Sequence, residues 1–169
     1  MSSKYSQMPE VMKVLAIDPG YDRFGIAVVE GDPSHPHFLW SDCVLPPKGV
    51  ASTRLAYISK ALSEAIATHA PDAIGMETLF FSINKKTALQ VAEVRGVVIA
   101  AAGLNKIPLI ECSPQAVKLA VTGYGNADKK AVAQMVPRLI TLPEKKRLDD
   151  EIDAIAVGIT ALAIGLPRT

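Results

Sequence analysis

The chain has 169 residues, of which 49% are hydrophobic and 21% charged, with a formal net charge of +1. This size and balance predict one compact domain, and the near-zero charge excludes nucleic-acid binding through overall basicity. The first ten residues are polar, which predicts a loose tail over 1–10 ahead of a single domain over 11–169 and excludes a signal peptide. Two isolated cysteines, Cys43 and Cys112, indicate reduced thiols and a cytoplasmic protein.

Short apolar segments predict the first three strands of a sheet, over residues 13–18, 24–30 and 37–44. The turn-rich stretch GDPSHP separates the second strand from the third, so the three are expected to form an antiparallel meander. Aliphatic residues at helical spacing then predict a helix over 52–69, with Ser52 or Thr53 as its N-cap.

Strands and helices alternate in the second half of the chain. The predicted strands are 72–77 and 108–112, and the predicted helices are 85–103, a helix opened by Ser113 and Pro114, 128–140 and 149–164. Such alternation implies crossover connections and parallel pairing, and hence a mixed sheet with helices on both faces. Pro137 is expected to kink or end the helix that contains it.

Acidic residues end two of the predicted strands. Asp18 ends the first strand and Glu77 the fourth, and functional groups gather at the carboxyl ends of strands in open α/β sheets. In the last helix Asp150 and Asp153 share a face, and Asp149, four residues before Asp153, can share it too. Singly, each residue is explained as a turn residue, a solvated strand end or a partner of the helix dipole. Their combination indicates a site.

Four carboxylates at one place would repel one another, by roughly 4 kcal/mol for two charges about 4 Å apart at an effective dielectric constant near 20. A cation is therefore expected among them. The three histidines lie outside these elements, which argues against zinc, and hard oxygen ligands favour Mg²⁺ or Mn²⁺. A pair of such ions suits in-line phosphoryl displacement, because one ion activates water and the other stabilises the leaving oxygen.

Four segments in order resemble the RuvC family of Holliday junction resolvases: LAIDPGYDRFGIAVVE, IGMETLFFSINKKTALQVAEVRGVVIAAA, SPQAVKLAVTGYGNADKKAVAQMV and DEIDAIAVGIT. The resemblance implies an RNase H-like fold with a mixed five-stranded sheet. It also implies a homodimer that cuts four-way DNA junctions symmetrically during homologous recombination and DNA repair. The expected cofactor is Mg²⁺, replaceable by Mn²⁺, with two ions per site, and the expected products carry 5′-phosphate and 3′-hydroxyl ends. A branch-migration complex of the RuvA and RuvB type is a further expected partner.

The same resemblance assigns the carboxylates. Asp18, Glu77, Asp150 and Asp153 match the catalytic and metal-binding positions of the family. The sequence that follows Asp153 fixes its register, whereas Asp149 flanks Asp150 and stays an alternative to it. The turn after Asp18 is expected to leave space for a phosphate.

Three further residues match family positions at the DNA. Phe80 matches the aromatic residue set against a base at the junction, where stacking contributes ~1–3 kcal/mol, and Phe81 is assigned to the core. Lys118 and Lys129 match lysines near the DNA backbone, although from the residues alone Lys129 belongs to a solvated helix face. The helix over 85–103 is the expected dimer surface, with a face buried inside the chain as the alternative. The basic run 144–147 is expected to be a solvated loop that could also touch phosphates.

Two other functions fit part of the sequence. An actin-like phosphotransferase also begins with an Asp-x-Gly phosphate loop, but it needs a second domain and a second phosphate loop that 169 residues do not contain. A catalytically silent junction-binding protein is the other alternative. The presence of an acidic residue at all four carboxylate positions argues against it.

Overall fold

The structure is a computed structural model that describes residues 11–79 and 85–166. The predictions for the tail over 1–10 and for Phe80 and Phe81 lie outside the described residues. Within them, every predicted strand and helix is found in the predicted order.

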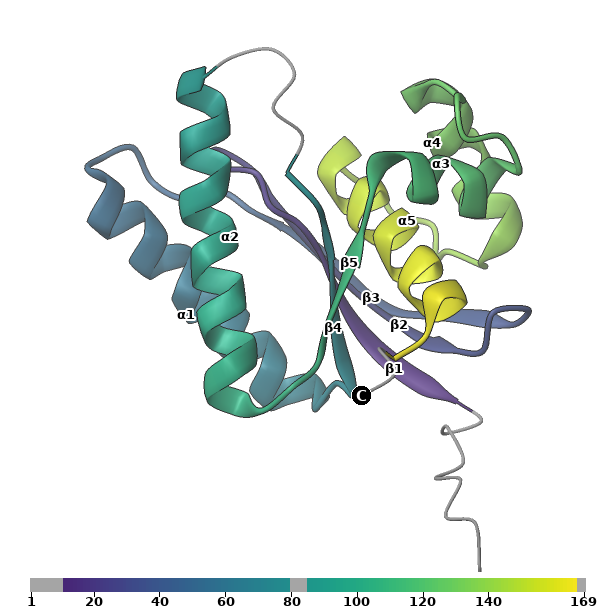
Figure 1. The fold of residues 1–169 in the computed structure, drawn as a ribbon, viewed down its shortest axis with the longest axis horizontal. Helices are drawn as coiled ribbons and strands as arrows, with labels where there is room; N and C mark the ends of the chain where they lie inside the picture. The colour runs from purple at the N-terminus through teal and green to yellow at the C-terminus, as the bar shows by residue number, and fades with distance from the viewer. Residues whose placement is uncertain (1–10, 80–84, 167–169) are drawn as a thin grey trace, which may run out of the picture.

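A five-stranded sheet forms the centre of the molecule (Figure 1). Its strands are β1 (Met12–Asp18), β2 (Phe24–Gly31), β3 (Pro36–Val44), β4 (Ala73–Glu77) and β5 (Leu109–Cys112), in the spatial order β3-β2-β1-β4-β5. The first three strands pair antiparallel, whereas β4 pairs parallel to β1 and β5 parallel to β4. Both the meander and the mixed sheet are therefore confirmed.

Helices cover both faces of this sheet. On one face lie α1 (Ala51–His69) and α2 (Lys85–Asn105), and on the other lie α3 (Pro114–Thr122), α4 (Lys129–Leu139) and α5 (Asp149–Ile164) (Figure 1). Helix α5 packs directly against β1 and β2, while α3 and α4 pack around it. The result is a layered α/β domain with a separate hydrophobic core on each side of the sheet.

The alternation of side chains along β1 supplies both cores and aims its last residue. Leu15 and Ile17 pack under α1 and α2, whereas Val14 and Ala16 pack under α5. Because side chains alternate along a strand, Asp18 continues the row that faces α5. Hydrophobic patterning in the sequence thus decides on which side of the sheet the carboxylate lies.

Small residues let α5 lie close to the sheet. A β-carbon added at Gly158 of α5 would lie 2.7 Å from Val29 Cγ2 and 3.2 Å from Ala16 Cβ. On β4, a β-carbon at Gly75 would lie 2.9 Å from Ala161 Cβ. Because no side chain could fit in these gaps, the helix backbone approaches the strands and carries its acidic first turn toward them.

Two local predictions about helix ends had different outcomes. The N-cap of α1 is Val50, without a side-chain cap, so the prediction of Ser52 or Thr53 is wrong. The side chain of Arg54 instead holds this end by donating to the backbone oxygens of Pro47 and Tyr21. Pro137 lies inside α4, and the helix ends two residues later at Leu139, as expected for a residue that removes a helical hydrogen bond.

Candidate active site

Two of the predicted carboxylates end neighbouring parallel strands. Ile17 of β1 pairs with Met76 of β4, so Asp18 and Glu77 follow side by side at the same edge of the sheet. Met76 packs under α1 and α2, so the next side chain on β4, that of Glu77, faces α5, as Asp18 does. The sequence prediction that these strands are neighbours is confirmed.

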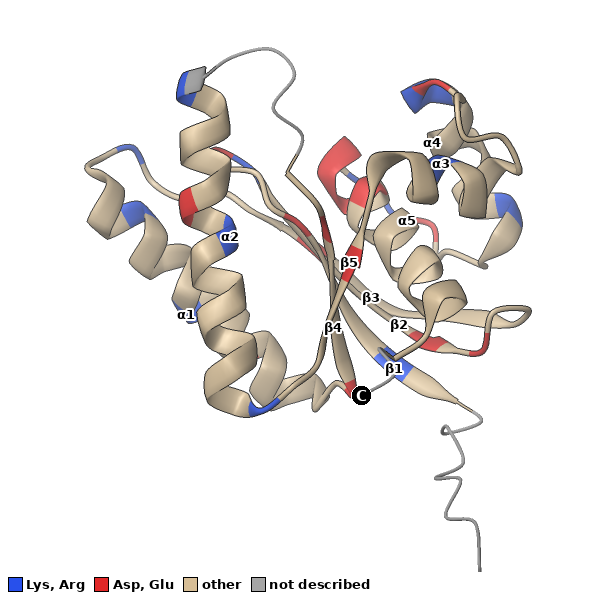
Figure 2. Cartoon of the chain, viewed as in Figure 1, with Lys and Arg blue, Asp and Glu red and all other residues tan. Residues whose placement is uncertain are grey.

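The first turn of α5 brings the other carboxylates to this edge. Figure 2 shows acidic residues at the start of α5 and in the neighbouring part of β4. A β-carbon at Gly25 of β2 would lie 2.1 Å from the backbone oxygen of Asp150 and 3.1 Å from Asp18 Cβ. The bare backbone at Gly25 therefore makes room for Asp150 beside Asp18. Sequence analysis missed Gly25, although an isolated glycine in a strand often marks a close approach of another backbone.

Burial and mutual repulsion raise the pKa values at this edge. Burial chiefly, and then the negative charges of Asp153, Glu77 and Asp150, raise the pKa of Asp18 to about 7. The pKa values of Glu77 and Asp153 are also raised, in both cases mainly by burial. The predicted carboxylates thus interact as one electrostatic group, which is a common property of functional sites.

Two cations of the chain already neutralise part of this group. Lys129 Nζ lies 2.7 Å from Asp153 Oδ2, and Arg23 Nη2 lies 2.7 Å from Asp150 Oδ2. Lys118 lies near enough to lower the pKa of Glu77. Lys129 is therefore more than a member of a solvated helix face. Sequence analysis missed Arg23, whose only signal was its place in the turn after Asp18.

The surroundings of the two adjacent aspartates of α5 differ. Asp149 is exposed, whereas the Asp150 side chain is only 20% exposed. Both aspartates raise the pKa of Asp153, and Asp150 is also among the charges that raise the pKa of Asp18. Asp150 Oδ2 is buried and pairs with Arg23, and the surrounding carboxylates provide the hard oxygens that Mg²⁺ or Mn²⁺ prefers.

The carboxylates share one edge, but they do not converge on a single point. Over residues 11–79 and 85–166, no three acidic, histidine or cysteine side chains are close enough together to hold a metal ion. Lys129 occupies the Asp153 oxygen in this arrangement. Coordination by several of these carboxylates therefore requires their side chains to rotate inward and this ion pair to open.

The basic run before α5 is more ordered than the sequence suggested. Lys145 Nζ lies 3.2 Å from Glu151 Oε2, to which the Ser41 hydroxyl donates at 2.8 Å. The guanidinium of Arg147 lies over the ring of Phe38, 5.0 Å from its centre. The run lies in a loop whose residues 144–146 are exposed, as expected, and in addition two of its cations join the start of α5 to β3.

Gly20 lies in the turn after Asp18, where space for a phosphate stays a prediction. A β-carbon there would lie 2.0 Å from the backbone oxygen of Arg23, so Gly20 is packed against its own turn. Its amide donates to the backbone oxygen of Asp18 at 2.9 Å. Gly20 thus serves the tight turn that follows the strand.

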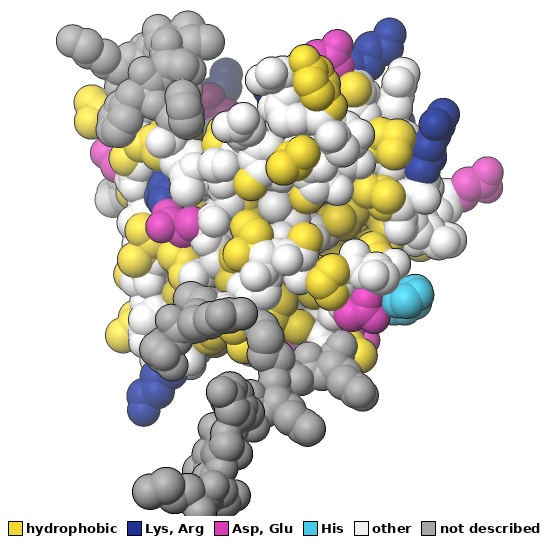
Figure 3. Space-filling view, turned by 45° about the vertical axis from the view of Figure 1, so that its right-hand side comes forward, with side chains coloured by type: hydrophobic (Ala, Val, Ile, Leu, Met, Phe, Trp, Pro, Cys, Tyr) yellow, Lys and Arg dark blue, Asp and Glu magenta, His cyan; other side chains and the backbone are white. Residues whose placement is uncertain are grey.

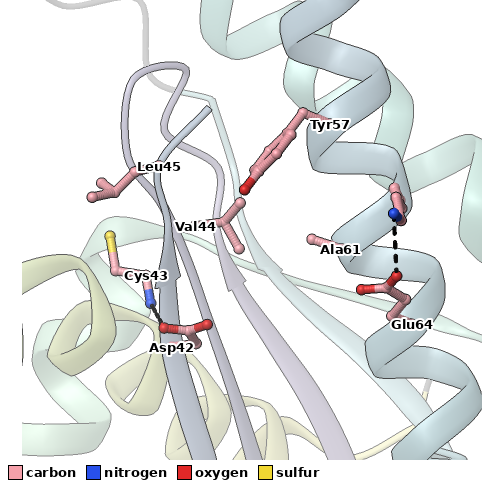
Figure 4. Close-up of a pocket in the computed structure, with 8 residues that line it drawn as sticks. Asp42, Cys43, Val44, Leu45, Tyr57, Ala61 and Glu64 are labelled. Atoms are coloured by element: carbon pink, nitrogen blue, oxygen red, sulfur yellow. Dashed lines mark hydrogen bonds and ion pairs between the residues drawn. The ribbon is translucent and has the colours of Figure 1, made fainter. Parts of the chain in front are cut away.

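A hollow lies between the end of β3 and α1 (Figure 4). Its lining residues are Asp42, Cys43, Val44, Leu45, Tyr57, Lys60, Ala61 and Glu64. None of the predicted site residues is among them. The candidate site is therefore an open edge with clustered charges, which suits a large substrate better than an enclosed pocket would.

Comparison with known proteins decides the family. Residues 14–161 match the family model of the crossover junction endodeoxyribonuclease RuvC. The chain belongs to the RuvC family. A RuvC from Moorella thermoacetica is 41% identical over 149 residues, which span 88% of this chain and 89% of that protein. Crossover junction endodeoxyribonuclease, the activity that names the family, is accordingly the activity of this chain.

Solved RuvC structures share the fold. RuvC of Thermus thermophilus in complex with a Holliday junction substrate has a TM-score of 0.81 and 31% identity, covering 88% of this chain and 92% of that one. The yeast mitochondrial Holliday junction resolvase has a TM-score of 0.69 at 16% identity, covering 93% of this chain and 80% of that one, which shows a common fold. The RNase H-like fold is thereby confirmed, and the RuvC family excludes the phosphotransferase interpretation.

The raised pKa of Asp18 predicts a pH dependence for metal binding. Between about pH 4 and pH 7 the folded chain keeps a proton on Asp18 that the unfolded chain has lost, because this pKa is raised from its usual value to about 7. The metal-free fold therefore loses stability as the pH rises through this range. A cation that binds Asp18 must displace that proton. We expect Mn²⁺ affinity to rise by up to about tenfold per pH unit below pH 7 and to level off above it, measured by calorimetric titration of the DNA-free protein.

The matched control for this titration is Asp18→Asn, which has no proton to displace at this position. Its Mn²⁺ affinity should be weak and should change less with pH than that of the wild-type protein, because only the protons of Glu77 and Asp153 remain to be displaced. Equal pH dependence in the two proteins would contradict a role for Asp18 in binding the cation.

Proposed function

We propose that Asp18, Glu77, Asp150 and Asp153 hold the Mg²⁺ ions with which this RuvC-family enzyme hydrolyses four-way DNA junctions, and that Mn²⁺ can replace Mg²⁺. The observation that carries this proposal is the meeting of these residues at one sheet edge, where Asp18 and Glu77 end neighbouring parallel strands and Gly25 leaves room for Asp150 beside Asp18. The Asp150 side chain is only 20% exposed and its charge raises the pKa of Asp18, which supports Asp150 over the exposed Asp149 as the fourth ligand.

Two ions per site suit in-line hydrolysis of a phosphodiester. One ion would activate the attacking water and the other would stabilise the 3′ oxygen that leaves, so that the products would carry 5′-phosphate ends. The protein's own contribution is charge placement. Lys129 and Arg23 lie 2.7 Å from Asp153 and Asp150 respectively. If metal ions bound these two aspartates in their place, the side chains of Lys129 and Arg23 would become free to bind phosphate oxygens of the substrate. The same side chains thus serve as counter-ions without the metal and as DNA contacts with it.

Cleavage of a labelled four-way junction with and without Mg²⁺ tests the assignment. Asp18→Asn should lower the single-turnover rate at least 100-fold while junction binding stays equal or tightens, because the substitution removes a negative charge that repels phosphates. Asp150→Ala should be similarly inactive, whereas Asp149→Ala should keep a rate within about threefold of the wild-type enzyme.

The paired alanine variants serve as controls for each other, since they change adjacent residues of one helix turn. An inactive Asp149→Ala with an active Asp150→Ala would show that the fourth ligand is misassigned. Near-normal cutting by Asp18→Asn would refute the metal site, and binding without magnesium-dependent cutting by the wild-type chain would favour a silent junction-binding protein.

Three residues are proposed to contact the junction. Lys118 and Lys129 bind backbone phosphates, which is supported by their influence on the pKa values of Glu77 and Asp18. On the face shown in Figure 3, hydrophobic side chains occupy the centre and single Lys or Arg side chains the margins. Phe80, three residues after Glu77, is proposed to stack on a base at the crossover.

Replacement of Phe80 by leucine keeps bulk but loses the flat aromatic face. We expect Phe80→Leu to fold and bind normally, to cut intact junctions about tenfold more slowly, and to recover on junctions whose crossover bases are already unpaired, because the aromatic stabilises unstacked bases. The measurement is the ratio of single-turnover rates on the two substrates. An unchanged ratio would show that Phe80 is not a wedge, and a large loss of thermal stability would assign it to the core.

A second copy of the chain is proposed to cover α2. Among the described residues, α2 contains one segment, Lys86–Asn105, that is long and apolar enough to cross a membrane, and 28% of it is buried. Val94 and Val98 face the core, whereas Leu89 and Leu104 are 67% and 85% exposed. A helix with one face in the core and an apolar outer face suits a homodimer with one site per subunit, which cuts two strands symmetrically.

Gly96 offers a test of this interface. It is exposed on α2, and a β-carbon added there would meet no atom within 4 Å in the chain itself. We expect Gly96→Leu to fold normally and to raise the dimer dissociation constant at least tenfold in sedimentation experiments, because the leucine separates the two helices. Gly49→Leu, at an equally open loop position, is the control. Equal dissociation constants for the two variants would place the dimer contact elsewhere.

The remaining proposals concern the cellular setting. We infer a cytoplasmic enzyme with a loose tail over 1–10 and one nuclease domain over 11–169, acting together with a branch-migration complex of the RuvA and RuvB type.

A further inference from the structure

A largely buried arginine side chain on α2, that of Arg95, reaches the strand end that carries Glu77. The Arg95 side chain is only 11% exposed. Its Nη1 donates to the backbone oxygen of Glu77, and its Nη2 pairs with the carboxylate of Glu111. Glu111 lies on β5 and pairs with Met76, the residue before Glu77. One guanidinium therefore joins helix α2 to the last residues of two strands.

Arg95 approaches Glu77 from the side of the sheet opposite to the other carboxylates. Met76 packs under α1 and α2, and Gly75 lies against Val157 and Ala161 of α5. By alternation the Glu77 side chain points to the α5 side, where Asp153 acts on it. Arg95 thus holds the main chain of Glu77 from behind and leaves its carboxylate free.

Main-chain pairing holds the end of β4 within the sheet, between Met76 and Ile17 of β1 and between Glu77 and Cys112 of β5. After Glu77, the Thr78 amide donates to the backbone oxygen of Cys112 at 2.9 Å, and β5 itself has only four residues. A hydrogen bond from a charged, desolvated guanidinium is stronger than a neutral one. Among the described side chains, Arg95 is accordingly well suited to fix where the strand ends.

We propose that Arg95 is a positioning residue that fixes the main chain at Glu77 and thereby sets the geometry in which this carboxylate binds the metal. The proposal rests on the function proposed above, because it presumes that Glu77 is a metal ligand. Arg95 touches neither substrate nor metal, and its effect passes through the carboxylate it positions. Residues that orient metal ligands in this way commonly change metal affinity by about 10–100-fold when replaced.

Arg95→Gln and Glu111→Gln form a matched pair. The first removes the bond to the Glu77 oxygen, and the second removes the ion pair but leaves that bond in place. We expect Arg95→Gln to weaken Mn²⁺ binding to the DNA-free protein about tenfold and to cut at saturating Mn²⁺ within about threefold of the wild-type rate. Its junction affinity in EDTA should stay within about twofold. Glu111→Gln should resemble the wild-type protein in all three measurements, and Arg95→Lys should regain part of the Mn²⁺ affinity.

Equal Mn²⁺ affinity in Arg95→Gln and the wild-type protein would overturn the proposal, as would equal losses in Arg95→Gln and Glu111→Gln. If Arg95→Gln does not fold, Arg95→Lys carries the test, with an expected loss of about threefold in Mn²⁺ affinity and no loss for Glu111→Gln. Failure of the wild-type chain to cut junctions would refute the proposed function instead. The Mn²⁺ titrations without DNA would then still decide whether Arg95 positions a metal ligand.

Discussion

The rest of the structure depends on one constraint: the acidic first turn of α5 must lie close to the ends of β1 and β4. Carboxylates placed there repel one another and lose hydration, as the pKa of Asp18 at about 7 shows. Packing must offset this cost, and α5 is buried from Ala154 to Leu162. Its four large aliphatic side chains in that stretch each contribute roughly 1.5–3 kcal/mol, which together exceeds the roughly 4 kcal/mol of one close like-charge pair.

Cations supplied by the chain complete this balance. Lys129 and Arg23 each come from an element other than α5, so their ion pairs with Asp153 and Asp150 also fasten α4 and the turn after β1 to the helix. The same ion pairs hold the two aspartates away from a shared point. Part of the negative charge of α5 is therefore neutralised within the chain itself, by side chains that other elements supply.

The sequence predicted the features that repeat along the chain, and it missed contacts between distant residues. Apolar runs that end in a carboxylate indicated the strands and their shared edge, because alternation and parallel pairing follow general rules. Gly25 beneath Asp150 shows in the sequence only as an isolated glycine in a strand, and Arg95 behind Glu77 has no local signature, since each matters through its neighbour in the fold. The start of α1 was misplaced for the same reason: tertiary bonds of Arg54, not a side-chain cap, hold it. The metal-ligand roles themselves stay predictions.

The missing side chain at Gly25 also restricts how this protein can evolve. Elsewhere on β2, one apolar residue can replace another when a neighbour adjusts, because side chains repack. At Gly25 the obstacle is the main chain of Asp150, which has no alternative rotamer to adopt. Any side chain acquired there by mutation would shift the helix that carries two of the acidic residues. We therefore expect glycine to be retained at position 25, although it contributes no chemical group to the site.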